Sequence, residues 1–147
     1  LFIRSQWHRH RTWSYNEISR RYTEEELKFY LAPQLRAQAA INRQASVSAD
    51  ETLDQALCRE MIDRQNKEAL AVYQELLQKG VCREQARGVL PQNLMTTFWA
   101  TVDLSNLLKF IELRASEHAQ WEIREYAEAI KTLIRPSIPH IAECQGW

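Results

Sequence analysis

A long helical pattern in the middle of the chain most constrains the fold. Ser48 and Glu51 have the spacing of a capping box, so a helix is predicted to begin there. It runs to about Lys79, where Gly80 supplies a C-terminal stop. Apolar side chains recur at helical spacing along this helix and are predicted to belong to the core, namely Leu53, Leu57, Met61, Ile62, Ala69, Tyr73, Leu76 and Leu77.

Weaker patterns predict shorter elements on both sides of this helix. Residues 1–8 predict a short buried strand or helix, residues 12–22 an ordered loop, and residues 34–49 the most mobile part. We predict strands over residues 27–31 and 95–102, and helices over residues 83–89, residues 104–114 with an Asp103 cap, and residues 117–135 before Pro136. The 147 residues have the size of one domain, so we predict a single α+β domain over residues 1–147, helix-dominated with a small antiparallel sheet.

Positive charge is concentrated between Arg4 and Arg21. Five arginines stand in this segment against one acid, Glu17, although the whole chain has 19 basic and 19 acidic residues. A cation cluster suits a phosphorylated ligand, because guanidinium groups match phosphate oxygens in a bidentate manner. A solvated basic face and a surface for nucleic acid are alternatives that charge alone does not exclude.

The order of residues in this segment resembles a known signature. Arg9, His10 and Arg11, followed after seven residues by Ser19, fill the fixed positions of the signature of the flavin-dependent thymidylate synthases, the ThyX family. The flanking residues agree, with Gln6-Trp7 before the motif and Ser14-Tyr15-Asn16-Glu17 inside it. Two later blocks are also similar to this family: Arg87-Gly88-Val89-Leu90-Pro91, and Leu113-Arg114-Ala115 with residues 118–123. The resemblance covers roughly residues 1–130.

The resemblance implies a ThyX-like fold and a specific reaction. That reaction is the reductive methylation of dUMP to dTMP, with 5,10-methylenetetrahydrofolate as the carbon donor and FAD, reduced by NADPH, as the hydride donor. It also implies a homotetramer with active sites at subunit interfaces, and no nucleic-acid or membrane partner. Compared with the family, the chain lacks the N-terminal third, so a truncated copy with impaired FAD binding is one alternative. Methylation of another uracil nucleotide, UMP, and a nucleic-acid-binding module are the others.

By resemblance, Arg114 is the catalytic residue. Carbon 5 of uracil is a poor nucleophile until the N3 proton ionises, and a fixed cation stabilises the resulting anion. The alternative is a surface pair with Glu117, three residues further along a helix.

The resemblance also implies two sets of ligand contacts. The dUMP contacts are Gln6, Trp7, His8, Arg9, Glu17, Ile18, Ser19, Arg20, Arg21, Arg87 and Arg114, with Arg9, Arg21 and Arg87 as phosphate clamps. Ser19 is expected to be a ligand, since no Asp-His arrangement for a serine nucleophile is evident. The FAD contacts are Arg9, His10, Arg11, Glu17, Asp103, Ser105 and Lys109.

The last three flavin contacts depart from the family pattern. Asp103 and Ser105 stand where the family often has Asn and then Arg or His, and Lys109 stands where Asn or His is common. Asp103 as a simple helix cap and Lys109 as an exposed side chain remain open. The chain has only three glycines and no Gly-x-Gly, so a flavin would be held by side chains rather than by a Rossmann turn.

The three cysteines, Cys58, Cys82 and Cys144, have neither metal-ligand spacing nor a Pro-Cys-His setting. We therefore expect no metal and a methylation chemistry without a cysteine nucleophile. No apolar run approaches the ~20 residues of a membrane span and no signal peptide is visible, so we expect a cytoplasmic protein.

Overall fold

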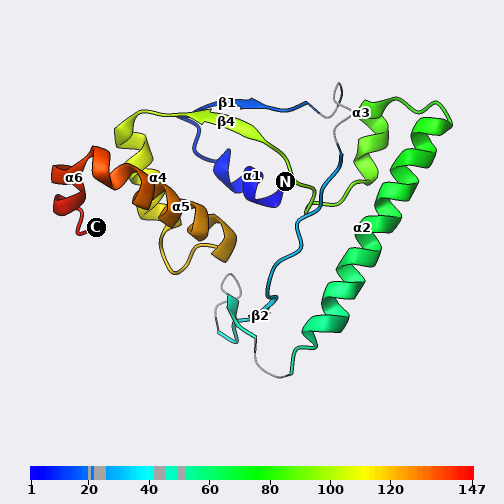
Figure 1. Cartoon of the computed structure of the whole chain (residues 1–147), viewed down its shortest axis with the longest axis horizontal. Coiled ribbons are helices and arrows are strands. Elements are labelled where there is room, and N and C mark those ends of the chain that lie inside the picture. Colours follow the sequence, from blue (N-terminus) through cyan, green and yellow to red (C-terminus); the bar gives the residue numbers. More distant parts are fainter. Residues whose placement is uncertain (20, 22–25, 42–45, 50–51) are drawn as a thin grey trace. The chain divides into compact units, whose positions relative to one another are not determined.

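The computed structural model describes residues 1–19, 21, 26–41, 46–49 and 52–147. Helices predominate and the strands form two small antiparallel sheets, which confirms the α+β prediction (Figure 1). The chain groups into two compact units, the first formed by Leu1–Arg4, Tyr15–Ala37 and Ser48–Ala100, and the second by Ser5–Ser14, Gln38–Val47 and Thr101–Trp147. In the described ranges, no helix is long and apolar enough to cross a membrane.

The first unit contains the predicted long helix, α2 (Gln55–Gln78), which begins later than expected. Asp54 is its N-cap and accepts a hydrogen bond from the Leu57 backbone N–H at 3.0 Å. The capping box predicted at Ser48 is therefore wrong, and its partner Glu51 lies outside the described residues.

The C-terminal end of α2 confirms the predicted glycine stop. Gly80 has a φ of +89°, a left-handed conformation that an L side chain rarely adopts. The Gly80 N–H donates to the Leu77 carbonyl at 3.0 Å, and the Val81 N–H donates to the Leu76 carbonyl at 2.9 Å. These two bonds form a Schellman motif, which satisfies carbonyls that the helix end would leave without partners.

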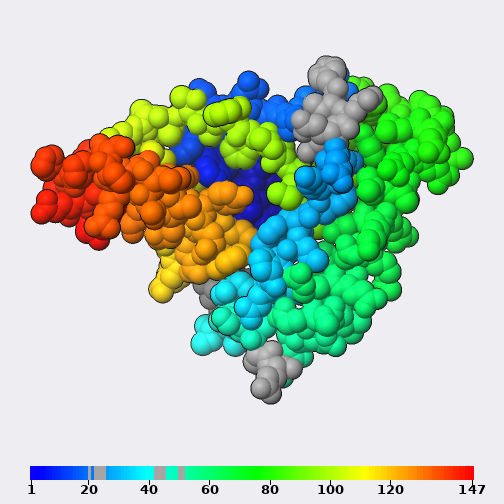
Figure 2. Space-filling view, in the orientation of Figure 1, coloured from blue at the N-terminus to red at the C-terminus, as the bar shows by residue number. Residues whose placement is uncertain are grey.

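The apolar stripe of α2 is only partly core. Ala69 is buried, but Leu57 is 53% exposed and Met61 51% exposed, so their prediction as core is wrong. The periodic pattern specifies an apolar face but not how much of it other elements cover. Here α3 (Arg83–Ala86) and the 3₁₀ helix η1 (Arg87–Val89) pack against α2. Together they occupy the span of the short helix predicted over residues 83–89, before Pro91. The surface of α2 is open along much of its length (Figure 2).

The strands differ most from the predictions. β1 (Ser14–Glu17) pairs with β4 (Phe98–Thr101), although a loop had been predicted for residues 12–22 and a longer strand for residues 95–102. In β1, Tyr15 and Glu17 are the less exposed positions. Because one of these two positions is an acid, the sequence lacks the alternation of apolar and polar residues that predicts a strand. In place of the strand predicted over residues 27–31, there is only an isolated bridge from Phe29 to Leu94.

The segment predicted to be the most mobile contains the second sheet. β2 (Arg36–Gln38) pairs with β3 (Ser46–Ser48), and residues 42–45 lie outside the described ranges. Both strands are three residues long and polar, so no apolar alternation marks them.

In the second unit, α4 (Leu104–Arg114) packs against α5 (Trp121–Ile134). Asp103 caps α4 as predicted and accepts from the Asn106 backbone N–H at 3.0 Å. The helix predicted from Glu117 begins only at Trp121, and Pro136 lies in η2 (Arg135–Ser137), ahead of α6 (Pro139–Cys144).

An aromatic cluster forms the core of the second unit beneath α1 (Phe2–Trp7). The Phe110 ring is fully buried, with its centroid 4.8 Å from that of Trp7 and 5.1 Å from that of Trp13. Tyr126 of α5 meets Trp7 edge-on at 5.6 Å. The Arg9–Arg11 motif therefore lies between Trp7 and Trp13, whose rings both pack against Phe110.

Candidate active site

Arg114 is the last residue of α4, and the structure places it against the Arg-His-Arg motif. Its Nε donates to Nε2 of His10 at 3.0 Å, and its Nη2 donates to the Gln6 backbone carbonyl at 3.2 Å. A cation is favoured at the C-terminal end of a helix, where the carbonyls leave a partial negative charge. The alternative, an ion pair between Arg114 and Glu117, does not form. Oε1 of Glu117 instead lies 3.9 Å from Nε2 of His118, at the surface.

His10 is held as a neutral imidazole. Because its Nε2 accepts a hydrogen bond, that nitrogen carries no proton and the proton of the neutral ring is on Nδ1. Burial lowers the pKa of His10 below its ordinary value, and the charge of Arg114 lowers it further. The ring centroid lies 4.8 Å from that of Phe110, so the aromatic core fixes the imidazole.

Positive charge accumulates around Arg114. Burial lowers the pKa of Arg114, and repulsion from Arg9 adds to that effect, although guanidinium retains its charge at any physiological pH. Arg9 and Arg11 are exposed, and neither forms an ion pair with a described residue. Cations that repel one another and lack a carboxylate partner suit an anionic ligand.

Gln6 is fixed by a residue that the sequence did not single out. Its Nε2 donates to Oε1 of Gln120, whose own Nε2 donates to Glu122 at 2.8 Å. Gln120 stands in one of the similar blocks, and this position was the only signal for it. Of the neighbouring residues, Trp7 is buried in the aromatic cluster and His8 is half-buried.

Glu17, predicted to touch both ligands, is held from two sides within the first unit. Its Oε2 accepts from Nη1 of Arg4 at 2.7 Å and its Oε1 accepts from the Thr96 hydroxyl at 2.7 Å. Only 22% of the Glu17 side chain and 34% of the Arg4 side chain are exposed. Arg4 was counted in the cation cluster without a role, and no sequence signal pointed to Thr96.

The segment after Glu17 holds three more of the predicted dUMP contacts. The Ile18 backbone N–H donates to the Thr97 carbonyl at 3.0 Å, which extends the pairing of β1 with β4. Ser19 is half-buried, and its hydroxyl accepts from the Arg21 N–H at 3.4 Å. Arg20 lies outside the described residues.

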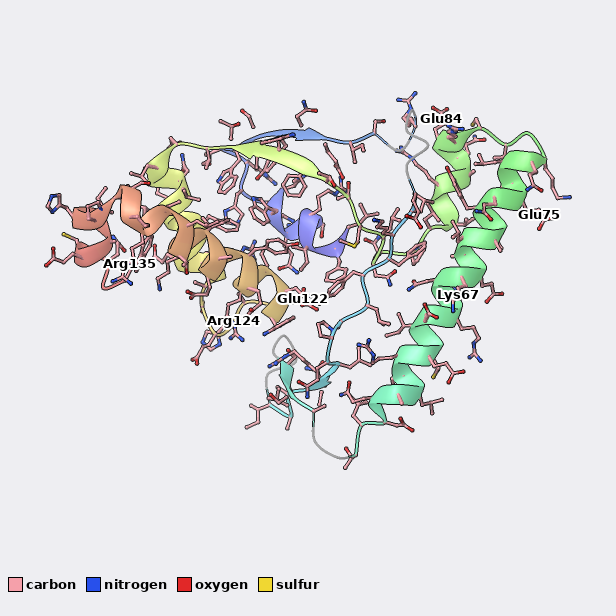
Figure 3. The ribbon with its side chains drawn as sticks, in the orientation of Figure 1. Lys67, Glu75, Glu84, Glu122, Arg124 and Arg135 are labelled. Carbon is pink, nitrogen blue, oxygen red and sulfur yellow. The ribbon has the colours of Figure 1, made fainter. Side chains whose placement is uncertain are left out.

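Two predicted phosphate clamps belong to the first unit. Arg21 pairs with Glu84 of α3 at 3.0 Å, with roughly half of each side chain exposed, and Glu84 is labelled in Figure 3. Arg87 is exposed at the start of η1. An acid paired with a clamp was not predicted, because Glu84 is far from Arg21 in sequence.

The predicted flavin contacts of α4 lie at the surface. The Asp103 carboxylate is engaged by Asn106, through the backbone N–H at 3.0 Å and the side-chain Nδ2 at 2.6 Å, and these bonds lower its pKa. Ser105 and Lys109 are exposed, four residues apart on the helix. The structure thus gives Asp103 a capping role and leaves the other two open to solvent.

The cysteines are separate from this arrangement. All three are free thiols, and Cys82 and Cys144 are exposed. Among the described residues, no cluster of three or more His, Cys, Asp or Glu side chains could hold a metal ion.

Comparison with known proteins decides the family. Residues 1–140 match the profile of the family described as thymidylate synthase complementing protein. The chain belongs to this family. Similar family members carry the name flavin-dependent thymidylate synthase: one from Thermus thermophilus is 45% identical over 139 residues, covering 95% of this chain and 50% of the relative. One from Aquifex aeolicus is 46% identical over 136 residues, covering 91% and 42%, and one from Dictyostelium discoideum is 41% identical over 147 residues, covering 97% and 48%.

The chain spans about half the length of these relatives. Family membership confirms the resemblance of the Arg-His-Arg motif and the two later blocks. The roles of individual residues remain predictions.

Proposed function

We propose that the chain forms the uracil-nucleotide site of a flavin-dependent thymidylate synthase, which methylates dUMP to dTMP. The observation that carries the proposal is the match of residues 1–140 to the thymidylate synthase complementing protein family. The arrangement of Arg114 supports it, because a cation fixed by His10 and the Gln6 carbonyl suits a ring that becomes an anion.

In this reaction a one-carbon unit passes from 5,10-methylenetetrahydrofolate to carbon 5 of the uracil. Arg114 stabilises the negative charge left when N3 loses its proton, which raises the electron density at carbon 5. Arg9, Arg21 and Arg87 bind the phosphate, since a nearly doubly charged group needs two or three cations to offset its loss of hydration. No cysteine is needed for the chemistry.

The donor set also fits FAD. Arg9 and Arg11 are exposed guanidinium groups without a carboxylate partner among the described residues, which suits a diphosphate. Lys109 adds a further exposed cation on α4. When bound, FAD supplies the hydride that completes the methyl group, and NADPH is the reductant.

Calorimetry with dUMP, deoxyuridine and UMP tests the proposal. Loss of the phosphate removes charged hydrogen bonds of about 1.5–3 kcal/mol each, so deoxyuridine should bind at least roughly 10-fold more weakly. Equal affinities for dUMP and deoxyuridine would contradict the phosphate clamp, and tighter binding of UMP than of dUMP would favour the ribonucleotide alternative.

Two further measurements address the remaining alternatives. The visible spectrum of the purified protein should show a flavin band near stoichiometry, whereas its absence would favour impaired FAD binding. Affinity for a DNA or RNA oligonucleotide that exceeds that for dUMP and falls steeply with salt would indicate a nucleic-acid-binding module.

We also propose a homotetramer, as the resemblance implies. The apolar side chains of Leu57, Met61 and Val72 on α2 are 53%, 51% and 41% exposed. Exposed apolar side chains of this kind support burial against another subunit. Sedimentation velocity should give the mass of four chains, and a monomer at micromolar concentration would contradict this proposal.

A further inference from the structure

The guanidinium of Arg114 is oriented without being neutralised. Its Nε–H and one Nη2–H are engaged by His10 and by the Gln6 carbonyl, neither of which carries a negative charge. No described residue engages the Nη1 donors. A guanidinium is planar, so two fixed hydrogen bonds set the plane in which its remaining donors point.

A carboxylate is the more usual partner for a buried arginine, and it would have the opposite electrostatic effect here. An adjacent negative charge would offset the cation and weaken its attraction for a developing anion. The two nearest acids in sequence lie at the surface: Glu112 is exposed, and Glu117 is 85% exposed and lies beside His118. The imidazole of His10 therefore supplies direction while leaving the full charge of Arg114 in place.

The surroundings of His10 favour this neutral state. Its ring contacts Phe110, with centroids 4.8 Å apart, and Trp13, with centroids 6.3 Å apart. The charge of Arg114 acts directly on His10, and Arg9 in turn repels Arg114. The hydrogen bond that Nε2 accepts from Arg114 and the positive charge of that guanidinium both oppose an imidazolium.

We propose that His10 is a positioning residue: its neutral imidazole, acting as a hydrogen-bond acceptor, aligns Arg114 for the uracil ring without cancelling its charge. The inference rests on the proposed function and extends it. It gives His10 a role that is separate from the flavin contact implied by resemblance.

Three substitutions separate acceptor, ring and charge. His10→Gln places an uncharged amide oxygen near the position of Nε2, whereas His10→Phe keeps the ring packing on Phe110 but has no acceptor. His10→Glu keeps an acceptor and adds a negative charge. Turnover should stay within about 3-fold in His10→Gln and fall about 10- to 100-fold in both His10→Phe and His10→Glu, with KM for dUMP nearly unchanged.

A spectroscopic measurement reads the contact itself. The ¹H–¹⁵N signal of the Arg114 Nε–H group should be protected from exchange in the wild type and in His10→Gln, and should exchange faster in His10→Phe. Flavin content is measured in each variant from the visible spectrum, and turnover is expressed per bound flavin, so that a loss of flavin is separated from a loss of positioning.

Each arm has an outcome that overturns the inference. Equal turnover in His10→Gln and His10→Phe would show that the acceptor does not matter, and wild-type turnover in His10→Glu would show that neutrality does not matter. Unchanged Arg114 exchange in His10→Phe, or loss of flavin that accounts for the lost turnover, would return His10 to a packing or flavin role. A protein with no methylation activity but with the expected exchange pattern would refute the proposed function while retaining the contact.

Discussion

The ion pair between Arg4 and Glu17 should stabilise the fold far more than the pair between Lys67 and Asp63 on α2. The two pairs have nearly equal N···O distances, 2.7 and 2.6 Å. They differ in exposure: 34% and 22% for Arg4 and Glu17, against 76% and 47% for Lys67 and Asp63. Lys67 lies on the open surface of α2 (Figure 3). Distance is thus matched while solvent screening is not.

The expected magnitude follows from this partial burial. A hydrogen bond to a charged group contributes about 1.5–3 kcal/mol when shielded, and residual exposure of both side chains reduces it. Nε of Arg4 is buried and has no hydrogen-bond partner among the residues that the structure describes, which reduces the net stabilisation. We therefore expect a coupling free energy of about 1–2 kcal/mol between Arg4 and Glu17.

A double-mutant cycle in urea measures this coupling. The free energy of unfolding is determined for Arg4→Met, Glu17→Gln and their combination, with Lys67→Met and Asp63→Asn as the matched control cycle. The control cycle should show no resolvable coupling, and added salt should change the Arg4–Glu17 coupling only slightly. Equal couplings in the two cycles, or an Arg4–Glu17 value below about 0.5 kcal/mol, would refute the argument from burial.

Four shorter predictions concern the second unit and the cysteines. Arg114→Ala should slow methyl transfer about 100- to 1000-fold while NADPH still reduces the flavin, and near-normal methyl transfer in stopped-flow would remove its catalytic assignment. Phe110→Ala deletes a fully buried ring and should lower the free energy of unfolding by about 3–5 kcal/mol, so a loss under about 2 kcal/mol in urea titration would contradict its place in the core. Burial and Arg114 lower the pKa of His10 in the folded chain, so the unfolded chain takes up this proton first as the pH falls. The free energy of unfolding should therefore decrease below about pH 6.5, until the lower folded pKa is passed. An equal pH dependence of unfolding in His10→Gln would oppose this. Replacing Cys58, Cys82 and Cys144 together by Ser should leave a folded, active protein. Complete loss of turnover in a folded triple variant would indicate that a cysteine takes part in the reaction.

Features set by local chemistry were predictable from the sequence. Asp103 caps α4 and Gly80 ends α2, because a short acid and a residue without Cβ act within a few positions of themselves. The start of α2 was misplaced, since Asp54 and Ser48 are both good caps and only the folded chain selects between them. Leu57 was assigned to the core because periodicity reveals an apolar face and not its cover.

The candidate site was predictable as a set of residues and not as a set of contacts. The motif identified Arg9, His10 and Arg114, yet nothing in the spacing indicated that His10 would accept a hydrogen bond from Arg114. Thr96 was not predictable for the same reason, because its hydroxyl donates to Glu17, which is 79 residues away in sequence. Long-range polar contacts leave no periodic trace in a single chain.

The bond between His10 and Arg114 joins residues 104 positions apart. At a synthesis rate of about 5–20 residues per second, the motif is made roughly 5–20 s before α4 is complete. The Arg-His-Arg segment must therefore remain without its arginine partner during that interval, and closing so long a loop precedes any reward from the contact. The cation arrangement can therefore form only after α4 has been made, and anion binding would report that the chain has folded as far as this helix.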